Sequence, residues 1–401
     1  MRLPVVFILL TVMINAMGVG LIIPVMPDLI REVTGGDLAN AALWGGVLAT
    51  VFAVMQFLFG PVVGNLSDRF GRRPVLLVSL FAMAADYVIM AVAGTMWLLL
   101  LGRVIGGITA ATQATATAYM ADISEPGKKA QNFGLVGAAF GLGFVIGPLM
   151  GGLLGEWGTR APFWAAAALA GANAALGYVV LGETVTDAIR RPFEWRRANP
   201  LGAFRSLRQL PGLGRLFTVF FLYQVAFFVY PAIWAYFGQA RFGWNAGMIG
   251  LSLGLFGVMM AVVQGGLIRL ILARLGPRGT VIYGLVFDIF AFGALAFVTS
   301  GTVALILTPL AALGAVITPA LQGLMSEVVG DRRQGELQGA LTSVGAVAMI
   351  VAPMLMTSVF AQFTRGGAPV DFPGAPFLVS LGLIVIALIL FLAPRRGAVA
   401  A

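Results

Sequence analysis

Long apolar runs, separated by short polar loops, make up most of this chain. Of its 401 residues, 60% are hydrophobic and only 10% are charged, whereas a soluble globular domain carries about a quarter charged residues. An apolar run of about 20 residues is the length that an α-helix needs to cross the hydrocarbon core of a bilayer. The sequence therefore predicts an all-α, polytopic membrane protein.

Twelve such runs can be drawn, and each is predicted to be a transmembrane helix. They cover residues 5–26, 41–64, 74–93, 97–119, 132–155, 161–181, 213–237, 245–270, 279–298, 302–325, 337–360 and 375–393. The chain contains no Cys and no His, which excludes thiolate and imidazole metal sites and His acid–base catalysis. A G-x-x-x-x-G-K-[ST] motif is also absent, so ATP is not expected to drive the protein. We predict neither an enzyme nor a metal site.

Most of the 25 Lys and Arg residues fall on one side of the twelve predicted helices. The positive-inside rule assigns that side to the cytoplasm, and an even number of crossings places both termini there. Topology thus accounts for the net charge of +9 without nucleic-acid binding. The first run continues through Ile23 and is needed for this topology, so we interpret it as an uncleaved helix rather than a signal peptide.

The sequence repeats itself with a shift of 205 positions. Gly71 then aligns with Gly276, and Pro148 aligns with Pro353. We predict an N-terminal half at residues 1–182, a cytoplasmic linker at 183–212 and a C-terminal half at 213–401. A parallel duplication of this kind predicts a substrate site near the membrane midplane, which the two halves expose alternately to each side. Because one chain supplies both halves, it is expected to function as a monomer.

Two carboxylates, Asp86 and Asp288, lie near the middle of the third and ninth runs. A charged side chain at that depth costs ~2.5–3.5 kcal/mol on insertion scales, so such a residue indicates a functional site. A low-dielectric environment favours the protonated carboxyl group, which suits a proton carrier. The alternative is a static ion pair or a hydrogen bond to a neighbouring helix. Arg103, in the fourth run, is the expected partner of Asp86, in a structural or a coupling role.

The loop between the second and third runs reads GNLSDRFGRRP. Its acid and its clustered arginines predict a latch that favours one facing of the transporter, in which Asp68 accepts hydrogen bonds from backbone donors at a neighbouring helix terminus and pairs with Arg72 or Arg73. The alternative is that the arginines only fix topology. The predicted gating residues are Gly64, Asp68, Arg69, Gly71, Arg72 and Arg73. The second copy has Ala273 opposite Asp68, so the latch is predicted to be asymmetric.

The fifth run contains regularly spaced glycines and one proline: Gly134, Gly143, Gly147, Pro148, Gly151 and Gly152. Small residues allow helix backbones to approach closely, and a proline inside a helix removes a hydrogen bond and produces a kink. We expect the two halves to meet at this helix. Generic tight packing is the alternative.

These motifs carry a family resemblance. The 64–74 loop resembles the signature of the major facilitator superfamily, and the fifth run resembles the antiporter motif of its drug-exporting branch. NAMGVGLIIPVMPDL, the Asp86–Tyr87 pair, RFGWN and PALQG resemble the tetracycline–proton antiporters over nearly all of the chain. The resemblance implies the major facilitator fold, a bacterial cytoplasmic membrane and proton-coupled export of tetracycline or a similar amphipathic drug. It implies no cofactor beyond the proton gradient and leaves open a divalent cation carried with the substrate.

The sequence departs from that family at two positions. Asn15 stands where the resembling exporters carry an Asp, and Met260 stands where they carry a His. Amide and aromatic side chains on the expected cavity faces suit an amphipathic, ring-containing solute, although each alone also fits helix packing. The predicted substrate-binding residues are Asn15, Gln56, Phe57, Gln113, Gln224, Trp234, Gln264 and Gln322, with Tyr223 nearby.

Three alternative functions remain open from the sequence. The chain could export a different drug class, transport another small metabolite with protons, or serve as a membrane receptor or scaffold without flux. The Gly147-Pro148 pattern argues against import. The absence of a long extramembrane domain argues against a scaffold.

Overall fold

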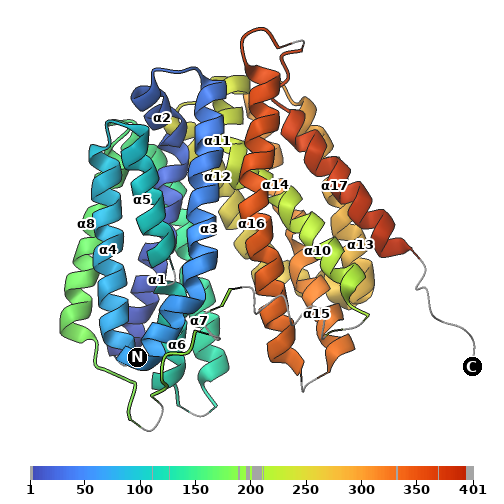
Figure 1. Cartoon of the computed structure of the whole chain (residues 1–401). Coiled ribbons are helices and arrows are strands. Elements are labelled where there is room, and N and C mark those ends of the chain that lie inside the picture. Colours follow the sequence, from blue (N-terminus) through green and yellow to red (C-terminus); the bar gives the residue numbers. More distant parts are fainter. Residues whose placement is uncertain are drawn as a thin grey trace, which may run out of the picture.

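The structure is a computed structural model that describes residues 3–110, 112–125, 127–187, 190–195, 199–200, 210, 212–330, 333–368 and 370–393. The side chains of residues 112, 113 and 130 lie outside this description. Regular structure in the described residues is entirely helical, as predicted (Figure 1).

Nineteen helical elements follow one another along the described residues. They are α1 (Leu3–Ile22), η1 (Ile23–Val25), α2 (Met26–Thr34), α3 (Leu38–Phe70), α4 (Arg72–Val92), α5 (Met96–Thr109), α6 (Thr112–Ile123), α7 (Lys129–Gly155), α8 (Ala161–Val180), α10 (Gly214–Phe227), α11 (Val229–Phe242), α12 (Ala246–Val262), η2 (Val263–Leu267), α13 (Ile268–Phe297), α14 (Gly301–Ala311), η3 (Ala312–Val316), α15 (Ile317–Val329), α16 (Gln334–Thr364) and α17 (Ala375–Leu392), where η1 to η3 are short 3-10 or π segments.

Eleven continuous helical stretches of the described chain are long and apolar enough to cross a membrane. One of them, Ala246–Phe297, has 52 residues and includes Gly276, whose φ of 65° and ψ of 173° are not helical. Gly276 therefore separates two membrane-spanning segments, and the described chain contains the twelve segments that its apolar runs predict. Gly276 is the repeat equivalent of Gly71, which has a φ of 111° and ends α3.

Several helices extend beyond the apolar runs that predict them. The second run was placed at residues 41–64, whereas α3 extends from Leu38 to Phe70. Asp37 caps its start, because its side chain accepts a hydrogen bond from the amide of Asn40 at 2.8 Å. Capping residues and glycines, rather than hydropathy, thus fix where these helices begin and end.

One span is interrupted, because the 3-10 segment η3 separates α14 from α15. A further irregular segment, the π-helical η2, packs against η3 and α13, and such segments are frequent at functional sites.

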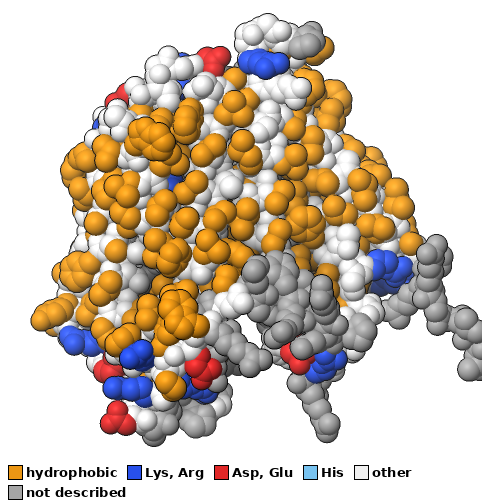
Figure 2. Space-filling view, viewed as in Figure 1, with side chains coloured by type: hydrophobic (Ala, Val, Ile, Leu, Met, Phe, Trp, Pro, Cys, Tyr) orange, Lys and Arg blue, Asp and Glu red, His pale blue; other side chains and the backbone are white. Residues whose placement is uncertain are grey.

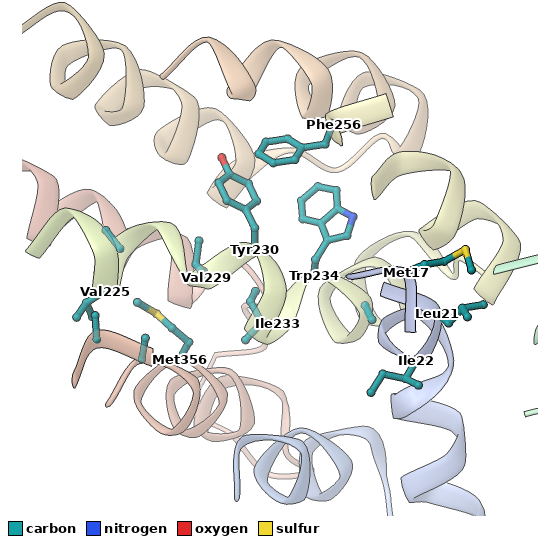
Figure 3. Close-up of a cluster of buried hydrophobic side chains, with 14 of the residues drawn as sticks. Met17, Leu21, Ile22, Val225, Val229, Tyr230, Ile233, Trp234, Phe256 and Met356 are labelled. Atoms are coloured by element: carbon teal, nitrogen blue, oxygen red, sulfur yellow. The ribbon is translucent and has the colours of Figure 1, made fainter. Parts of the chain in front are cut away.

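The helices form two groups, which are here called the first group (residues 3–180) and the second group (residues 214–392). Figure 1 shows the blue-to-green first group on one side and most of the yellow-to-red second group on the other. The groups meet chiefly where α3 packs on α16 and where α7 packs on α12. Figure 3 shows Met17 and Leu21 of α1 in the same buried cluster as Tyr230, Trp234 and Phe256 of the second group.

The surface is apolar over the middle of the molecule. Figure 2 shows hydrophobic side chains across this band, with Lys, Arg, Asp and Glu gathered toward both ends. Phe290, well inside α13, is one of the large hydrophobic side chains that are exposed. A lipid environment satisfies such a surface, whereas water would not.

Candidate functional site

The two groups touch at one end of the molecule and diverge at the other. At the end remote from the linker, the hydroxyl of Thr50 on α3 donates to the carbonyl of Ile350 on α16 at 3.3 Å. A Cβ built on Gly152 of α7 would lie 2.6 Å from the carbonyl oxygen of Ala246. Toward the linker, a Cβ built on a glycine of the same three helices meets nothing within 4 Å: Gly60, Gly64, Gly134, Gly137, Gly335 and Gly339. The helices are thus closed together at one end and open at the linker end.

The first predicted acid, Asp86, is paired with Arg103 inside the first group. Asp86 lies on α4 and is 2% exposed, Arg103 lies on α5 and is 8% exposed, and their side chains are 3.3 Å apart. The guanidinium group of Arg103 also contacts the sulfur of Met90 and lies over the ring of Phe52, 5.4 Å from its centroid. Asp86 Oδ1 and Arg103 Nε are buried without a hydrogen-bond partner. The expected contact is present, and its role in proton coupling stays a prediction.

The second predicted acid, Asp288, has no charged partner in the described residues. It lies on α13, is 3% exposed, and its Oδ2 atom has no hydrogen-bond partner. The hydroxyl of Tyr230 is likewise buried and unpartnered. The Tyr230 ring lies 5.6 Å from that of Phe292, one turn beyond Asp288. A buried ionised carboxylate without a cation is costly, so this environment suits a carboxyl group that carries a proton.

Each acid packs against a glycine of the following span. A Cβ built on Gly106 of α5 would lie 2.5 Å from Asp86 Oδ2, and one built on Gly314 of η3 would overlap the carboxylate of Asp288. Gly106 lies in the last turn of α5, and Gly314 lies within η3. These glycines were not identified from the sequence, because only the fold brings them to the acids.

The predicted gating loop forms an ion-pair network at the linker end. Asp68 Oδ1 lies 2.6 Å from a guanidinium nitrogen of Arg72, as predicted, and Arg72 Nε lies 3.3 Å from Asp122 Oδ2. Thr184, at the start of the linker, donates to Asp122 at 3.0 Å. These contacts lie within the first group and the linker, so the loop does not tie the two groups together in this conformation.

A carboxylate other than Asp68 caps the neighbouring helix terminus. The side chain of Glu183 accepts from the backbone amides of Arg72 and Arg73, at 2.9 and 3.2 Å. Gly71 leaves room for this carboxylate, because a Cβ at that position would overlap it. The expectation that Asp68 accepts from backbone donors is therefore corrected, since Asp68 lies in the last turn of α3 and binds the side chain one turn ahead. Sequence alone gave no signal that residue 183 approaches residue 72.

The remaining arginines of the loop have local roles. The guanidinium group of Arg73 donates to the carbonyl of Tyr178 at 3.0 Å and lies over its ring. Arg69 lies over the ring of Phe70, 5.0 Å from the centroid. The Arg73 contacts attach the loop to α8, whereas the Arg69 contact lies within the loop itself.

The small residues of the fifth span face two different helices. Gly143, Gly147 and Gly151 lie against the backbone of α1, whereas Gly152 lies against α12. Pro148 contacts both α1 and α12, since a Cβ on Gly20 or on Gly250 would overlap it. Close helix packing is thus observed, but Gly151 and Gly152 do not share one face, because adjacent residues on a helix point about 100° apart.

The predicted substrate-binding residues differ from one another in how far they are buried. Five of them are half-buried: Asn15, Gln56, Phe57, Gln224 and Gln322. Gln264 is exposed on η2, and its amide nitrogen lies 3.9 Å from the sulfur of Met260. The side chain of Gln113 lies outside the described residues.

Trp234 does not line a cavity in this structure. Its side chain is 0% exposed, and its indole nitrogen donates to the hydroxyl of Ser252 at 2.8 Å. Its ring packs with those of Tyr230, Phe237 and Phe377. Tyr223 is also buried. Prediction from the sequence erred here because an indole whose single polar group is satisfied can be buried completely.

Residues 8–353 match the Major Facilitator Superfamily. The chain belongs to this superfamily. It is 42% identical to the tetracycline resistance protein, class C, of Escherichia coli over 391 residues, which are 98% of this chain and 96% of that protein. It is 40% identical to the class G protein of Vibrio anguillarum over 90% of this chain and 91% of that protein.

A solved structure shares the architecture. The crystal structure of the human organic anion transporter MFSD10 (TETRAN) superposes with a TM-score of 0.70 at 25% identity and covers 97% of this chain and 99% of that chain. The predicted major facilitator fold is thereby confirmed. The chain is a multi-pass membrane transporter of small molecules.

Proposed function

We propose that this major facilitator transporter exports tetracycline or a similar amphipathic drug across the bacterial cytoplasmic membrane in exchange for protons. The observation that carries the proposal is the pair of buried acids, Asp86 and Asp288, each packed against a glycine of the following span. The similarity to tetracycline resistance proteins over almost the whole chain supports the substrate class. The protein is proposed to be a transporter without enzymatic activity that functions as a monomer.

The conformation of the protein supports entry of the drug from the cytoplasmic side. The positive-inside rule places the linker and both termini in the cytoplasm, and the helices diverge toward the linker end. A drug would therefore enter this conformation from the cytoplasm and would leave after the two groups close at the linker end and open at the other. The contacts of α3 with α16 and of α7 with α12 would then break.

The two acids are proposed to have different roles in coupling drug export to proton entry. Asp288 has no cation and would take up a proton while the site faces outward, then release it to the cytoplasm when the site faces inward. Asp86 is held by Arg103, which stabilises its ionised form and leaves Oδ1 available to a substrate or a proton. Each transported drug molecule would thereby be exchanged for protons that move down their gradient.

Substrate contacts are proposed for the half-buried amides. Asn15, Gln56, Gln224 and Gln322 can bind the polar edge of a drug, and Phe57 can pack on its ring. The described chain holds no cluster of three His, Cys, Asp or Glu side chains that could bind a metal ion. Any divalent cation bound by the drug would be carried with it, and no cofactor resident on the protein is proposed.

Transport into inverted membrane vesicles tests this function. With an imposed pH gradient, acid inside, vesicles that contain the protein should accumulate labelled tetracycline, and vesicles that contain the Asp288→Asn variant should not. A substrate panel in the same assay distinguishes an exporter of a different drug class, which Asn15 and Met260 favour as the second candidate. Absence of gradient-driven uptake of every amphipathic compound by correctly inserted protein would contradict the proposal.

A further inference from the structure

A carboxylate of the first group caps a helix of the second group at the closed end. Glu156 directly follows α7, and its Oε1 atom accepts from the backbone amide of Gly247, in the first turn of α12, at 2.9 Å. The helix's own cap, Asn245, accepts from the amide of Met248 instead. Glu156 thus satisfies an amide that α12 itself leaves free, at the end of the helix where the dipole favours a negative charge.

This contact depends on an unusually close approach of the two groups. A Cβ built on Gly155 would lie 2.9 Å from that of Ala246, and one built on Gly247 would lie 2.9 Å from Oε1 of Glu156. The end of α12 reaches the carboxylate only because these positions lack side chains. If the groups separated here, the hydrogen bond would be lost.

A second carboxylate bridges the groups nearby. Asp28, half-buried on α2, accepts from the side-chain amide of Gln239 on α11 at 3.0 Å. The carbonyl oxygen of the same Gln239 side chain is buried without a partner. Asp28 also lies 3.8 Å from Arg31, on its own helix. This contact therefore also holds only while the closed end stays closed.

Other acids at this end bind within one group. Glu32 accepts from Thr159 at 2.6 Å and pairs with Arg160 at 3.0 Å, and all three residues belong to the first group. The seam between α3 and α16 has an open cavity of about 430 Å³ near Asp37 and Arg365. Glu156 and Asp28 differ from these acids because their hydrogen bonds cross between the groups.

We propose that Glu156 and Asp28 form an outer latch that stabilises the conformation open to the linker end. The proposal rests on the alternating-access cycle proposed above. Both hydrogen bonds must break each time the transporter opens at the opposite end, so each carboxylate biases the equilibrium between the two facings by the free energy of its contact. The 64–74 loop provides the comparison, because its carboxylate, Asp68, bonds to Arg72 within the first group in this conformation.

Disulfide cross-linking between α3 and α16, away from the proposed latch, measures the equilibrium between the two facings. The chain has no native Cys, so Gly46→Cys with Thr357→Cys introduces one reporter pair. A Cβ on Gly46 would lie 3.1 Å from that of Thr357, near the 3.5–4.5 Å that a disulfide needs. The pair lies between α3 and α16, away from Glu156, and cross-links only while this end is closed.

Two substitutions remove the latch charges without removing side-chain volume. In the protein that carries the reporter pair, Glu156→Gln and Asp28→Asn should each lower the rate of cross-linking about two- to fivefold. This change matches the free energy that a charged group contributes through a contact at a helix terminus or with an amide. Glu32→Gln is the matched control, because it neutralises an acid at the same end whose partners lie in its own group, and it should leave the rate unchanged.

The outcomes separate the latch from the transport function. Unchanged cross-linking in both variants, or an equal fall in Glu32→Gln, would overturn the outer latch. A fall in one variant alone would assign the latch to that residue and exclude the other. Since cross-linking needs neither drug nor proton gradient, failure of tetracycline transport would not affect this result, and normal transport with unresponsive cross-linking would overturn the latch alone.

Discussion

The carboxylate of Asp86 lies 3.3 Å from the guanidinium group of Arg103, and both side chains are almost fully buried. Asp288, at a similar depth in the second group, has no charged partner in the described residues. The two halves of a duplicated chain thus hold their acids in different electrostatic environments. Burying a charge pair is costly, and breaking it is costlier because one charge then remains unpaired.

The first prediction concerns this pair. Arg103→Ala leaves the Asp86 carboxylate buried without its cation and should destabilise the protein by about 3–5 kcal/mol. The double variant Arg103→Ala with Asp86→Asn removes both charges and should recover part of that loss. Thermal unfolding of the purified proteins in detergent measures both. Simple additivity of the two substitutions would show that the pair does not interact energetically.

A second prediction separates proton coupling from substrate binding. Asp288→Asn keeps the size of the side chain but cannot titrate, so uphill transport driven by a pH gradient should be lost while downhill drug exchange persists. The two modes are compared in the same proteoliposomes. Full gradient-driven transport by this variant would place the coupling residue elsewhere.

The third prediction uses the glycine beside Asp288. Gly314→Ala places a methyl group where the carboxylate lies, so either η3 or Asp288 must shift, at a cost of about 1–3 kcal/mol. Transport should fall at least severalfold, with membrane insertion preserved. Gly323→Ala, in the same span with nothing within 4 Å of its Cβ, is the control. Equal activity of both variants would mean that contact with Gly314 does not matter.

Sequence reasoning located the helices, both acids and Arg103 as the partner of Asp86, but not the contacts between distant segments of the chain. Apolar length predicts the twelve segments, and depth along the helix predicts the contact between Asp86 and Arg103, since both quantities are local. The approach of Glu183 to Arg72 joins segments that are 111 positions apart, so no spacing rule could reveal it. Trp234 was misplaced for a related reason, because its burial depends on the hydroxyl of Ser252 on another helix.

A fourth prediction addresses the gating loop. Asp68→Asn removes an ion pair that is partly exposed and lies within the first group, so thermal stability should change by no more than about 1 kcal/mol. Transport should nevertheless fall severely if Asp68 acts when the linker end closes. Drug binding to the purified variant, measured by fluorescence quenching, should stay close to that of the native chain. Normal turnover would leave the loop with a topological role only.

The last prediction concerns the substrate. Asn15 cannot titrate, and the thioether of Met260 is a weak ligand, so transport of tetracycline should depend little on Mg²⁺. Asn15→Asp with Met260→His restores a carboxylate and an imidazole to α1 and α12 and should raise both the rate of tetracycline transport and its dependence on Mg²⁺. Initial rates in vesicles with Mg²⁺ and with EDTA measure this, and Asn15→Asp alone shows whether the carboxylate suffices. If the native chain already requires Mg²⁺ as strongly as the double variant, the half-buried amides must bind the metal–drug complex without these two groups.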